Sequence, residues 1–362
     1  MALFKKTERM LGVDLSPTAV KLVELSRSGK RIQIEAAAME PLPEGAMTDR
    51  NPSDLDQLTA ALKRAVKGSG TTLKKVALAV PTSSVITRTI TMPAEYGEDE
   101  IEANIQVEAA QYVPFPLEEI YLDFQTQMSV DGRKTTADTQ EVMIVASRRE
   151  NVDLRDEVVK EAGLKAVVVD VEAYALENAF ALMRPVASGA LVPSDGGSGD
   201  LRTALVEIGT GVMTLYVFDG DRVTFTREQI FGTEQLIQAM VDTYGMTREQ
   251  AVQSRQSGEL PADYLPMVVE PFRLAVAEQI SNALQFFFSS SHYNSVDYVV
   301  LVGDGALVEE LDEAVGGALG ISTVIGNPFA EATIAKRVNR QMLQRNAPSF
   351  ATACGLAMRS FG

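Results

Sequence analysis

Two stretches of the sequence repeat one pattern: an apolar strand that ends in an acid, a turn of small and hydroxylated residues, and a second apolar strand. Residues 12–25 read GVDLSPTAVKLVEL, and residues 204–217 read ALVEIGTGVMTLYV. Apolar alternation on both sides of a short turn predicts a β-hairpin in each place. The two copies favour a duplicated fold, with one half built on each hairpin.

Alignment of the two stretches pairs Asp14 with Glu207 and Leu22 with Leu215, so each predicted hairpin has an acid at the end of its first strand. Unrelated hairpins also share apolar, acidic and small positions over so short a stretch, and coincidence therefore stays an alternative. A segment rich in Gly, Ser and Pro, residues 188–200, lies just before the second hairpin. This is where a connection between two halves is expected.

A length of 362 residues exceeds one ordinary core and suits two lobes. Between the hairpins, apolar periodicity predicts helices over residues 53–66, 98–112 and 151–162, and strands over residues 76–80, 84–92, 121–128 and 141–146. We interpret residues 83–164 as a subdomain inserted into the first lobe. The first lobe then comprises residues 1–82 and 165–190, and the second lobe residues 191–362.

The composition excludes several classes of protein. The chain has no run of about 18 apolar residues, and the apolar run near its start is cut at Asp14, so neither a membrane span nor a signal peptide is predicted and the cytoplasm is expected. The single cysteine, Cys354, lies among small residues and is expected to be a buried filler. With one histidine, His292, the chain lacks partners for a Cys/His metal site or a Cys/His nucleophile. A Mg²⁺ site built from carboxylates stays an alternative.

The net charge of −16 argues against nucleic acid as a partner, because nucleic-acid binding requires clustered lysine and arginine. A basic protein partner fits this charge better. The same charge repels an anionic nucleotide. A phosphate site in this chain must therefore supply local compensation from backbone N–H groups, a lysine or a metal ion.

Three turns of small residues that follow predicted strands fit such a phosphate site. They contain Asp14, Ser16 and Thr18; Glu207, Gly209 and Thr210; and Gly303, Asp304 and Gly305. Backbone N–H groups and hydroxyls of such turns bind phosphate, Lys21 neutralises charge, and Asp14 and Glu207 are candidate Mg²⁺ ligands, mostly through water. Each turn alone is also explained by the tolerance of glycine for positive φ. Together they predict two phosphate-binding hairpins that face each other across a cleft.

Longer stretches carry a resemblance to a known family: LGVDLSPTAVKLVELSRSG, QYVPFPLEEIYLDF, VVDVEAYALENAF, TREQIFGTEQL, LQFFFSSSHYNSVDYVVLVGDGA and ACGLAMRSF. They are spread over nearly the whole chain and resemble the PilM family of type IV pilus assembly proteins. The resemblance implies an actin-like (FtsA-like) α/β fold, a duplicated ribonuclease H-like fold of two lobes. It identifies residues 1–82 and 165–190 as subdomain 1A, residues 83–164 as the inserted subdomain 1C, and residues 191–362 as subdomains 2A and 2B.

The resemblance also implies ATP or ADP as a cofactor, with Mg²⁺. It assigns the phosphate motifs to Asp14, Ser16, Thr18, Lys21, Glu207, Gly209 and Thr210, the adenosine motif to residues 303–306, a cleft-lining glycine to Gly232, and an adenine-side position to Arg255. Relatives commonly have aspartate in place of Glu207 and glycine in place of Asp304. The longer side chain of Glu207 displaces its carboxylate by on the order of a C–C bond, which disturbs the positioning of water. We therefore expect nucleotide binding more than hydrolysis and assign no catalytic residue.

As a function, the resemblance implies a nucleotide-binding scaffold that is peripheral at the inner membrane and needed for pilus assembly and twitching motility. The implied partners are the N-terminal tail of PilN, other pilus platform proteins, and further copies of the chain in a ring or other homo-oligomer, with membrane association indirect. Tyr112, Phe115 and Leu117 are candidate anchors for the tail, although core packing explains each of them too. The alternatives are an ATP-hydrolysing enzyme of the same superfamily, for which Glu207 is the one candidate base, and an FtsA-like filament protein.

Overall fold

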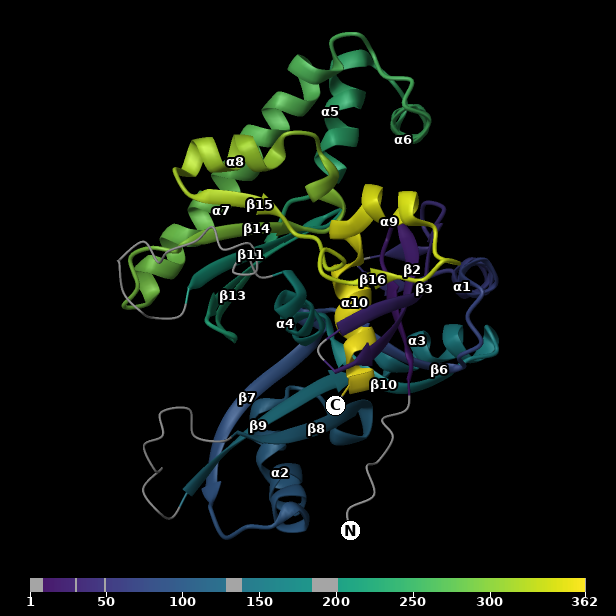
Figure 1. Ribbon diagram of the computed structural model, residues 1–362. Coiled ribbons are helices and arrows are strands. Elements are labelled where there is room, and N and C mark those ends of the chain that lie inside the picture. Colours follow the sequence, from purple (N-terminus) through teal and green to yellow (C-terminus); the bar gives the residue numbers. More distant parts are fainter. Residues whose placement is uncertain (1–8, 30, 49, 128–138, 184–200, 362) are drawn as a thin grey trace.

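Two β-sheets, one in each lobe, form the centre of the molecule, and a third, smaller sheet extends from the first lobe (Figure 1). The computed structural model describes residues 9–29, 31–48, 50–127, 139–183 and 201–361. The connection expected at residues 188–200 lies outside these ranges. Among the described residues, no helix has both the length and the apolar character that crossing a membrane requires.

The first sheet contains six strands in the order β10-β6-β1-β2-β3-β16. They are β1 (Leu11–Leu15), β2 (Ala19–Ser28), β3 (Arg31–Pro41), β6 (Lys75–Val80), β10 (Lys165–Val171) and β16 (Thr333–Ile334). β1, β2 and β3 form an antiparallel meander, and β6 and β10 continue the sheet beside β1 in parallel. Every residue of β1 is buried, because helices and neighbouring strands cover it on both faces.

The second sheet repeats this arrangement with the order β13-β12-β11-β14-β15. Its strands are β11 (Arg202–Ile208), β12 (Val212–Asp219), β13 (Arg222–Ile230), β14 (Tyr298–Val302) and β15 (Ser322–Ile325). Again three antiparallel strands are followed by two parallel ones. The predicted duplication is confirmed, and the sequence alignment holds in register: Val13 pairs with Leu22 in the first hairpin, and Val206 pairs with Leu215 in the second.

Helices cover one face of each sheet. In the first lobe, α1 (Leu55–Ser69) and α3 (Arg149–Glu161) pack on β1 and β6, and a short ribbon of β4 (Met47–Thr48) and β5 (Asn51–Pro52) precedes α1. In the second lobe, four helices surround the largest apolar cluster: α5 (Glu234–Tyr244), α6 (Arg248–Ser257), α7 (Glu270–Ser290) and α8 (Leu311–Leu319). Helix boundaries follow local signals; for α1, Asp54 accepts a hydrogen bond from the N–H of Gln57, and Gly70 ends the helix with a φ of 67°.

The inserted unit is built on a three-stranded antiparallel sheet of order β7-β9-β8. Its elements are β7 (Val85–Pro93), α2 (Glu98–Tyr112), β8 (Ile120–Gln127) and β9 (Thr139–Arg148). Helix α2 covers this sheet through Ile101, Ile105 and Ala109. The next helix, α3, packs in the core of the first lobe, although sequence analysis includes it in the insertion at residues 83–164. The limits of the subdomains stay a prediction.

The C-terminal segment crosses back from the second lobe to the first sheet (Figure 1). β16 pairs with β3, while α9 (Arg340–Asn346) and α10 (Ala351–Met358) join an apolar cluster on β2 and β3. Sequence analysis places all of residues 191–362 in the second lobe, whereas these elements contact the first, because periodicity indicates burial without indicating the burying sheet. Cys354 lies in this cluster and is fully buried, as expected.

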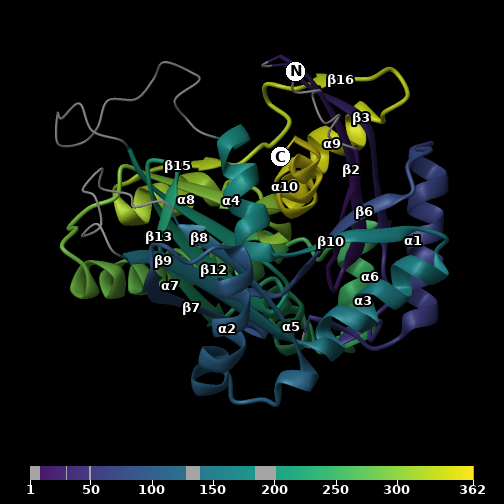
Figure 2. The ribbon, with the colours of Figure 1, turned by 90° about the horizontal axis from the view of Figure 1, so that it is seen from below.

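Two helices, α4 (Glu172–Met183) and α10, lie between the two large sheets and join the lobes (Figure 2). α4 packs on the second sheet and α10 on the first. The helices meet at Gly355, where an added Cβ would lie 1.6 Å from the carbonyl oxygen of Ala175. On the other side of α10, a Cβ at Gly12 would lie 2.0 Å from the carbonyl oxygen of Ala353. Glycine at both places permits an approach of backbones that no other residue allows.

Candidate functional site

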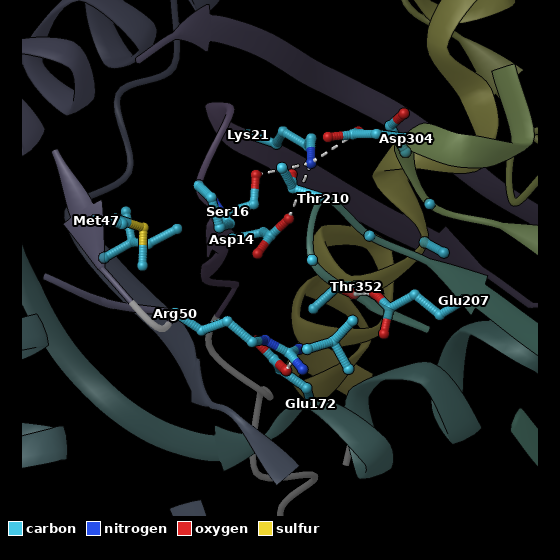
Figure 3. Close-up of a pocket in the computed structure, with 18 of the residues that line it drawn as sticks. Asp14, Ser16, Lys21, Met47, Arg50, Glu172, Glu207, Thr210, Asp304 and Thr352 are labelled. Atoms are coloured by element: carbon cyan, nitrogen blue, oxygen red, sulfur yellow. Dashed lines mark hydrogen bonds and ion pairs between the residues drawn. The ribbon is translucent and has the colours of Figure 1, made fainter. Parts of the chain in front are cut away.

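A cavity of about 450 Å³ lies between the lobes where the two hairpins face each other (Figure 3). Its wall comes from the β1–β2 and β11–β12 hairpins, the β4–β5 ribbon, the turn after β14, the start of α4, and the start of α10 with the segment before it. Eight residues singled out in the sequence line it: Asp14, Ser16, Lys21, Glu207, Gly209, Thr210, Gly303 and Asp304. The fold thus brings the acidic ends of β1 and β11 to one cavity.

Lys21 is the buried cation of the first hairpin. It is 3% exposed and pairs with Asp14 in the register of β1 and β2. Its Nζ donates to Ser16 Oγ at 3.0 Å and lies 3.4 Å from Asp14 Oδ2 and 3.4 Å from Asp304 Oδ1. Burial lowers the pKa of Lys21, but the two carboxylates outweigh burial and raise the pKa above its ordinary value. The Lys21 ammonium therefore stays charged in the wall of the cavity at neutral pH.

The turn after β14 is pressed against the end of β11. Gly303 has a φ of 85°, and a Cβ there would lie 2.7 Å from the carbonyl oxygen of Ile208. A Cβ at Gly305 would lie 2.2 Å from the Ile208 side chain. Between the two glycines, Asp304 points across the cleft, and Thr18 Oγ1 donates to its Oδ2 at 2.5 Å. This hydrogen bond joins the second lobe to the first.

A second charged group comprises Arg50, Glu172 and Glu207 (Figure 3). The Arg50 guanidinium pairs with Glu172, the first residue of α4, and lies 3.8 Å from Glu228 of β13. Burial raises the pKa of Glu207 to about 7; the charge of Arg50 opposes this shift, and the charge of Glu172 adds to it. Thr352 Oγ1 lies at hydrogen-bond distance, 3.4 Å, from Glu207 Oε1. Arg50 is thus the cation that compensates the acids on this side of the cavity.

The placement of Arg50 depends on a second arginine. Arg50 lies between β4 and β5 with a φ of 64°, a conformation that is uncommon for residues other than glycine. Arg155 of α3, 1% exposed, donates to the carbonyl oxygen of Arg50 at 2.6 Å and to Asn51 Oδ1 at 3.2 Å. These two hydrogen bonds fix the backbone from which the Arg50 side chain reaches the cavity.

The two candidate Mg²⁺ ligands, Asp14 and Glu207, both line the cavity, and carboxylate oxygens are the ligands that Mg²⁺ prefers. Burial raises the pKa of both side chains, so a cation between them would stabilise their ionised forms. In the described ranges, however, no three or more His, Cys, Asp or Glu side chains are grouped so that they could bind one ion together. The pair fits an ion held mainly through water, and Mg²⁺ binding stays a prediction.

Two further cavities adjoin the first. One, of about 790 Å³, is lined by residues that include Thr18, Thr210 and Arg255. The other, of about 610 Å³, is lined by residues that include Thr18, Arg255 and Asp304. The three cavities share lining residues: Thr210 lines the first and the second, and Asp304 lines the first and the third. Thr18 and Arg255 lie in the two adjoining cavities and outside the first.

Two of the predicted glycines, Gly232 and Gly305, line none of these three cavities. A Cβ at Gly232 would lie 2.3 Å from the carbonyl oxygen of Thr210, and Gly305 packs against Ile208. Both glycines therefore contribute by having no side chain, because this allows their backbone to pack closely against the β11–β12 turn that lines the cavity.

Sequence reasoning missed four polar side chains of the cavity: Arg50, Glu172, Ser349 and Thr352. Glu172 had a signal, because it directly follows the parallel strand β10 just as the other acids stand at the ends of β1 and β11. Arg50 had none, since nothing in the local sequence marks a residue other than glycine that adopts a positive φ. Thr352 reaches the cavity only because α10 returns to the interface between the lobes.

The three candidate peptide anchors lie at the end of α2 and in the short turn that follows. Tyr112 is 42% exposed and lines a groove of about 390 Å³ between β7 and α2. Phe115 is 38% exposed, and the Arg148 guanidinium lies 5.4 Å from the centre of its ring. Leu117 packs against a small apolar cluster that includes Val113. Two of the three therefore offer exposed ring surface, while Leu117 mainly packs.

The duplicated sheets, the facing hairpins and the cleft between the lobes define the class of protein: a two-lobed protein of actin-like fold. The chain belongs to the family described as type IV pilus assembly protein PilM, whose family model matches residues 12–361. The family and the fold expected from the sequence are thereby confirmed.

Solved structures agree with this assignment. The chain is similar to one from a PilM-PilN type IV pilus biogenesis complex, with 25% identity and a TM-score of 0.78 over 98% of this chain and 99% of that chain. It is also similar to the ethanolamine utilization protein EutJ from Carboxydothermus hydrogenoformans, with 15% identity and a TM-score of 0.57 over 97% of this chain and 89% of that chain. At that identity, the second likeness shows the fold alone.

Proposed function

We propose that this chain is a nucleotide-binding scaffold of the type IV pilus assembly machinery and that it binds the N-terminal tail of PilN. Family membership and the similarity to a chain of the PilM-PilN complex support the assembly role. The nucleotide part rests on one observation, the buried ammonium of Lys21 where the hairpins of both lobes meet. The proposed location is the cytoplasmic face of the inner membrane, with attachment through PilN and other platform proteins. Pilus assembly and twitching motility then depend on this chain.

ATP or ADP is the proposed ligand. Its phosphates contact Lys21, Ser16, Thr18, Gly209 and Thr210, and its nucleoside contacts the turn at residues 303–305 and Arg255. The donor chemistry supports this placement, since one cation and three hydroxyls converge on an elongated space. Bound Mg²⁺, held through water by Asp14 and Glu207, supplies further positive charge to the phosphates.

The nucleotide is proposed as a structural ligand. A ligand that contacts both lobes stabilises the closed form by mass action. A hydrogen bond links the cleft to the segment that leads into the inserted unit: Glu172 lines the cavity, and the N–H of the next residue, Ala173, donates to Thr82 Oγ1 at 3.2 Å. Thr82 begins the 3-10 turn Thr82–Ser84, which directly precedes β7, and β7 borders the groove at Tyr112. Closure of the cleft can therefore change the affinity for a peptide in that groove.

Isothermal titration tests this function. A synthetic peptide of the N-terminal cytoplasmic tail of PilN from the same organism is titrated into the purified protein, with and without Mg-ATP. We expect saturable one-to-one binding, and binding weaker by roughly tenfold in Tyr112→Ala, the loss typical of one aromatic anchor. Phe286→Ala is the matched control, because Phe286 is an aromatic residue of α7 that is 51% exposed and lies in the other lobe.

Equal binding by the Tyr112→Ala and Phe286→Ala variants would remove the groove at β7 and α2 from the proposal. An absence of binding heat in both nucleotide states, together with steady release of phosphate from ATP, would replace the scaffold with an ATP-consuming enzyme. A difference between the titrations with and without Mg-ATP gives the coupling free energy between the two sites directly.

A further inference from the structure

The cleft contains an anion of its own. Asp304, in the turn after β14, extends its carboxylate across the cleft to two residues of the first lobe (Figure 3). Thr18 Oγ1 donates to Oδ2 at 2.5 Å, and Lys21 Nζ lies 3.4 Å from Oδ1. Thr18 and Lys21 are two of the residues proposed above to bind phosphate. Both already contact an acid of the same chain.

The backbone around Asp304 fixes the position of this carboxylate. Gly303 and Gly305 are pressed against Ile208, and the N–H of Gly303 donates to the carbonyl oxygen of Pro348 at 3.0 Å. The Asp304 side chain is 18% exposed. Its Oδ1 is buried and, within the part of the chain that the structure describes, accepts no hydrogen bond although it faces the ammonium. A phosphate oxygen in this place faces the same ammonium, and a second phosphate oxygen accepts the Thr18 hydrogen bond that Oδ2 gives up.

Charge balance shows why Asp304 and a phosphate compete. Burial raises the pKa of Asp304, but the charge of Lys21 and the hydrogen bond from Thr18 outweigh burial, so the net pKa lies below its ordinary value and the group is ionised at neutral pH. Asp14 also faces Lys21, at 3.4 Å. One ammonium therefore serves two carboxylates. A phosphate that arrives beside them meets a net negative charge until one carboxylate moves away.

We propose that Asp304 is a resident anion in the phosphate position of the cleft, and that a phosphate-bearing ligand binds only by displacing its carboxylate from Thr18 and Lys21. The inference rests on the proposed nucleotide function and deepens it, because it names the residue that sets the affinity for phosphate. Asp304 belongs to the second lobe and both of its partners to the first. The same contact therefore bridges the lobes when no ligand is bound.

The test compares the unchanged protein with Asp304→Asn by isothermal titration of Mg-ADP and, separately, of inorganic pyrophosphate. Asparagine keeps the shape of the side chain and removes its charge, so Lys21 becomes available to phosphate. We expect Asp304→Asn to bind Mg-ADP roughly 10- to 100-fold more tightly, the range of one charge-assisted hydrogen bond. Glu313→Gln, an exposed residue of α8, makes the same change in net charge and is expected to leave the affinity unchanged.

Thermal unfolding without ligand supplies a second measurement. Asp304→Asn loses a contact between the lobes, so its melting temperature is expected to fall while its affinity for Mg-ADP rises. If Asp304 only stabilised the closed lobes, its substitution would lower both the melting temperature and the affinity for Mg-ADP. The opposite signs of the two effects are therefore specific to a resident anion.

The outcomes separate this inference from the proposed function. If both proteins bind Mg-ADP and Asp304→Asn binds no more tightly, the resident anion is overturned and the nucleotide site stands. If neither protein binds Mg-ADP or pyrophosphate, the nucleotide function is overturned and the inference with it. An equal gain in affinity for Mg-ADP in Asp304→Asn and Glu313→Gln would assign the gain to net charge. This result would also overturn the inference.

Discussion

At the scale of single residues, the cleft keeps its buried charges in compensated groups. Lys21 and Arg50 are the basic residues among those lining the first cavity, and each is surrounded by carboxylates from both lobes. A buried charge without a partner is costly, so the removal of either cation leaves acids that have lost water without gaining a counter-charge. The effect of a substitution in the cleft on the free energy of unfolding therefore depends more on how deeply the paired side chains are buried than on the number of ion pairs.

Arg50→Ala tests this reasoning. Arg50 and Glu172 pair with side chains only 21% and 12% exposed, so we expect the substitution to lower the free energy of unfolding by about 2–4 kcal/mol. Arg64→Ala is the control, because Arg64 pairs with Glu40 at 3.1 Å while 54% exposed, and should cost less than about 1 kcal/mol. Urea unfolding followed by circular dichroism measures both. Equal losses would show that burial of the Arg50 pair contributes nothing.

How much of the site the sequence predicts differs from residue to residue. Asp14 and Glu207 were found because a strand that ends in an acid before a small turn is a local pattern, and Lys21 was found as the lysine of the first hairpin. Asp304 was expected near phosphate, but its hydrogen bond to Thr18 joins residues 286 positions apart and depends on how the lobes meet. Arg50 escaped prediction for the same reason: its backbone is fixed by a helix from elsewhere in the chain.

At the scale of elements, the strands and helices were predictable, while their partners were less so. Both hairpins formed in the expected register, because alternation and turn residues are properties of short segments. The helix α3 was expected but was grouped with the inserted unit, and residues 351–358, which form α10, were grouped with the second lobe. An apolar face indicates that a helix is buried, and the sheet that buries it is decided by tertiary packing.

The crossing of α4 and α10 gives a prediction at this scale. Gly355→Ala places a Cβ 1.6 Å from the carbonyl oxygen of Ala175, so the two backbones must separate. We expect a loss of about 3 kcal/mol or more in the free energy of unfolding, at the upper end for an overpacked site. Gly317→Ala on α8, where a Cβ meets nothing within 4 Å, should be neutral or stabilising by up to about 1 kcal/mol. Chemical unfolding measures both, and similar effects would contradict the close crossing.

At the scale of the whole molecule, the lobes are joined by more than the crossing of two helices. The C-terminal segment leaves the second lobe and completes the first sheet with β16, α9 and α10. Polar contacts cross the cleft as well, from Thr18 to Asp304 and from Arg248 of α6 to Glu44. The duplication predicted two equivalent lobes, but not this shared segment, because it has no counterpart in the repeat.

The shared interface predicts that the two lobes unfold together. Cys354 of α10 is fully buried, and burial raises the pKa of its thiol, so a thiol reagent reacts with it only after the interface opens. The chain has no tryptophan, and Phe288 is partly buried against the core cluster of the second lobe, so Phe288→Trp adds one tryptophan at the edge of that core. We expect the labelling of Cys354 and the fluorescence of Phe288→Trp to change at one denaturant concentration. Gly355→Ala should lower both midpoints by the same amount, because it weakens an interface to which both lobes contribute. Two separate midpoints would mean that the lobes are independent units, and closure of the cleft by a ligand would then have to supply all of the coupling between them.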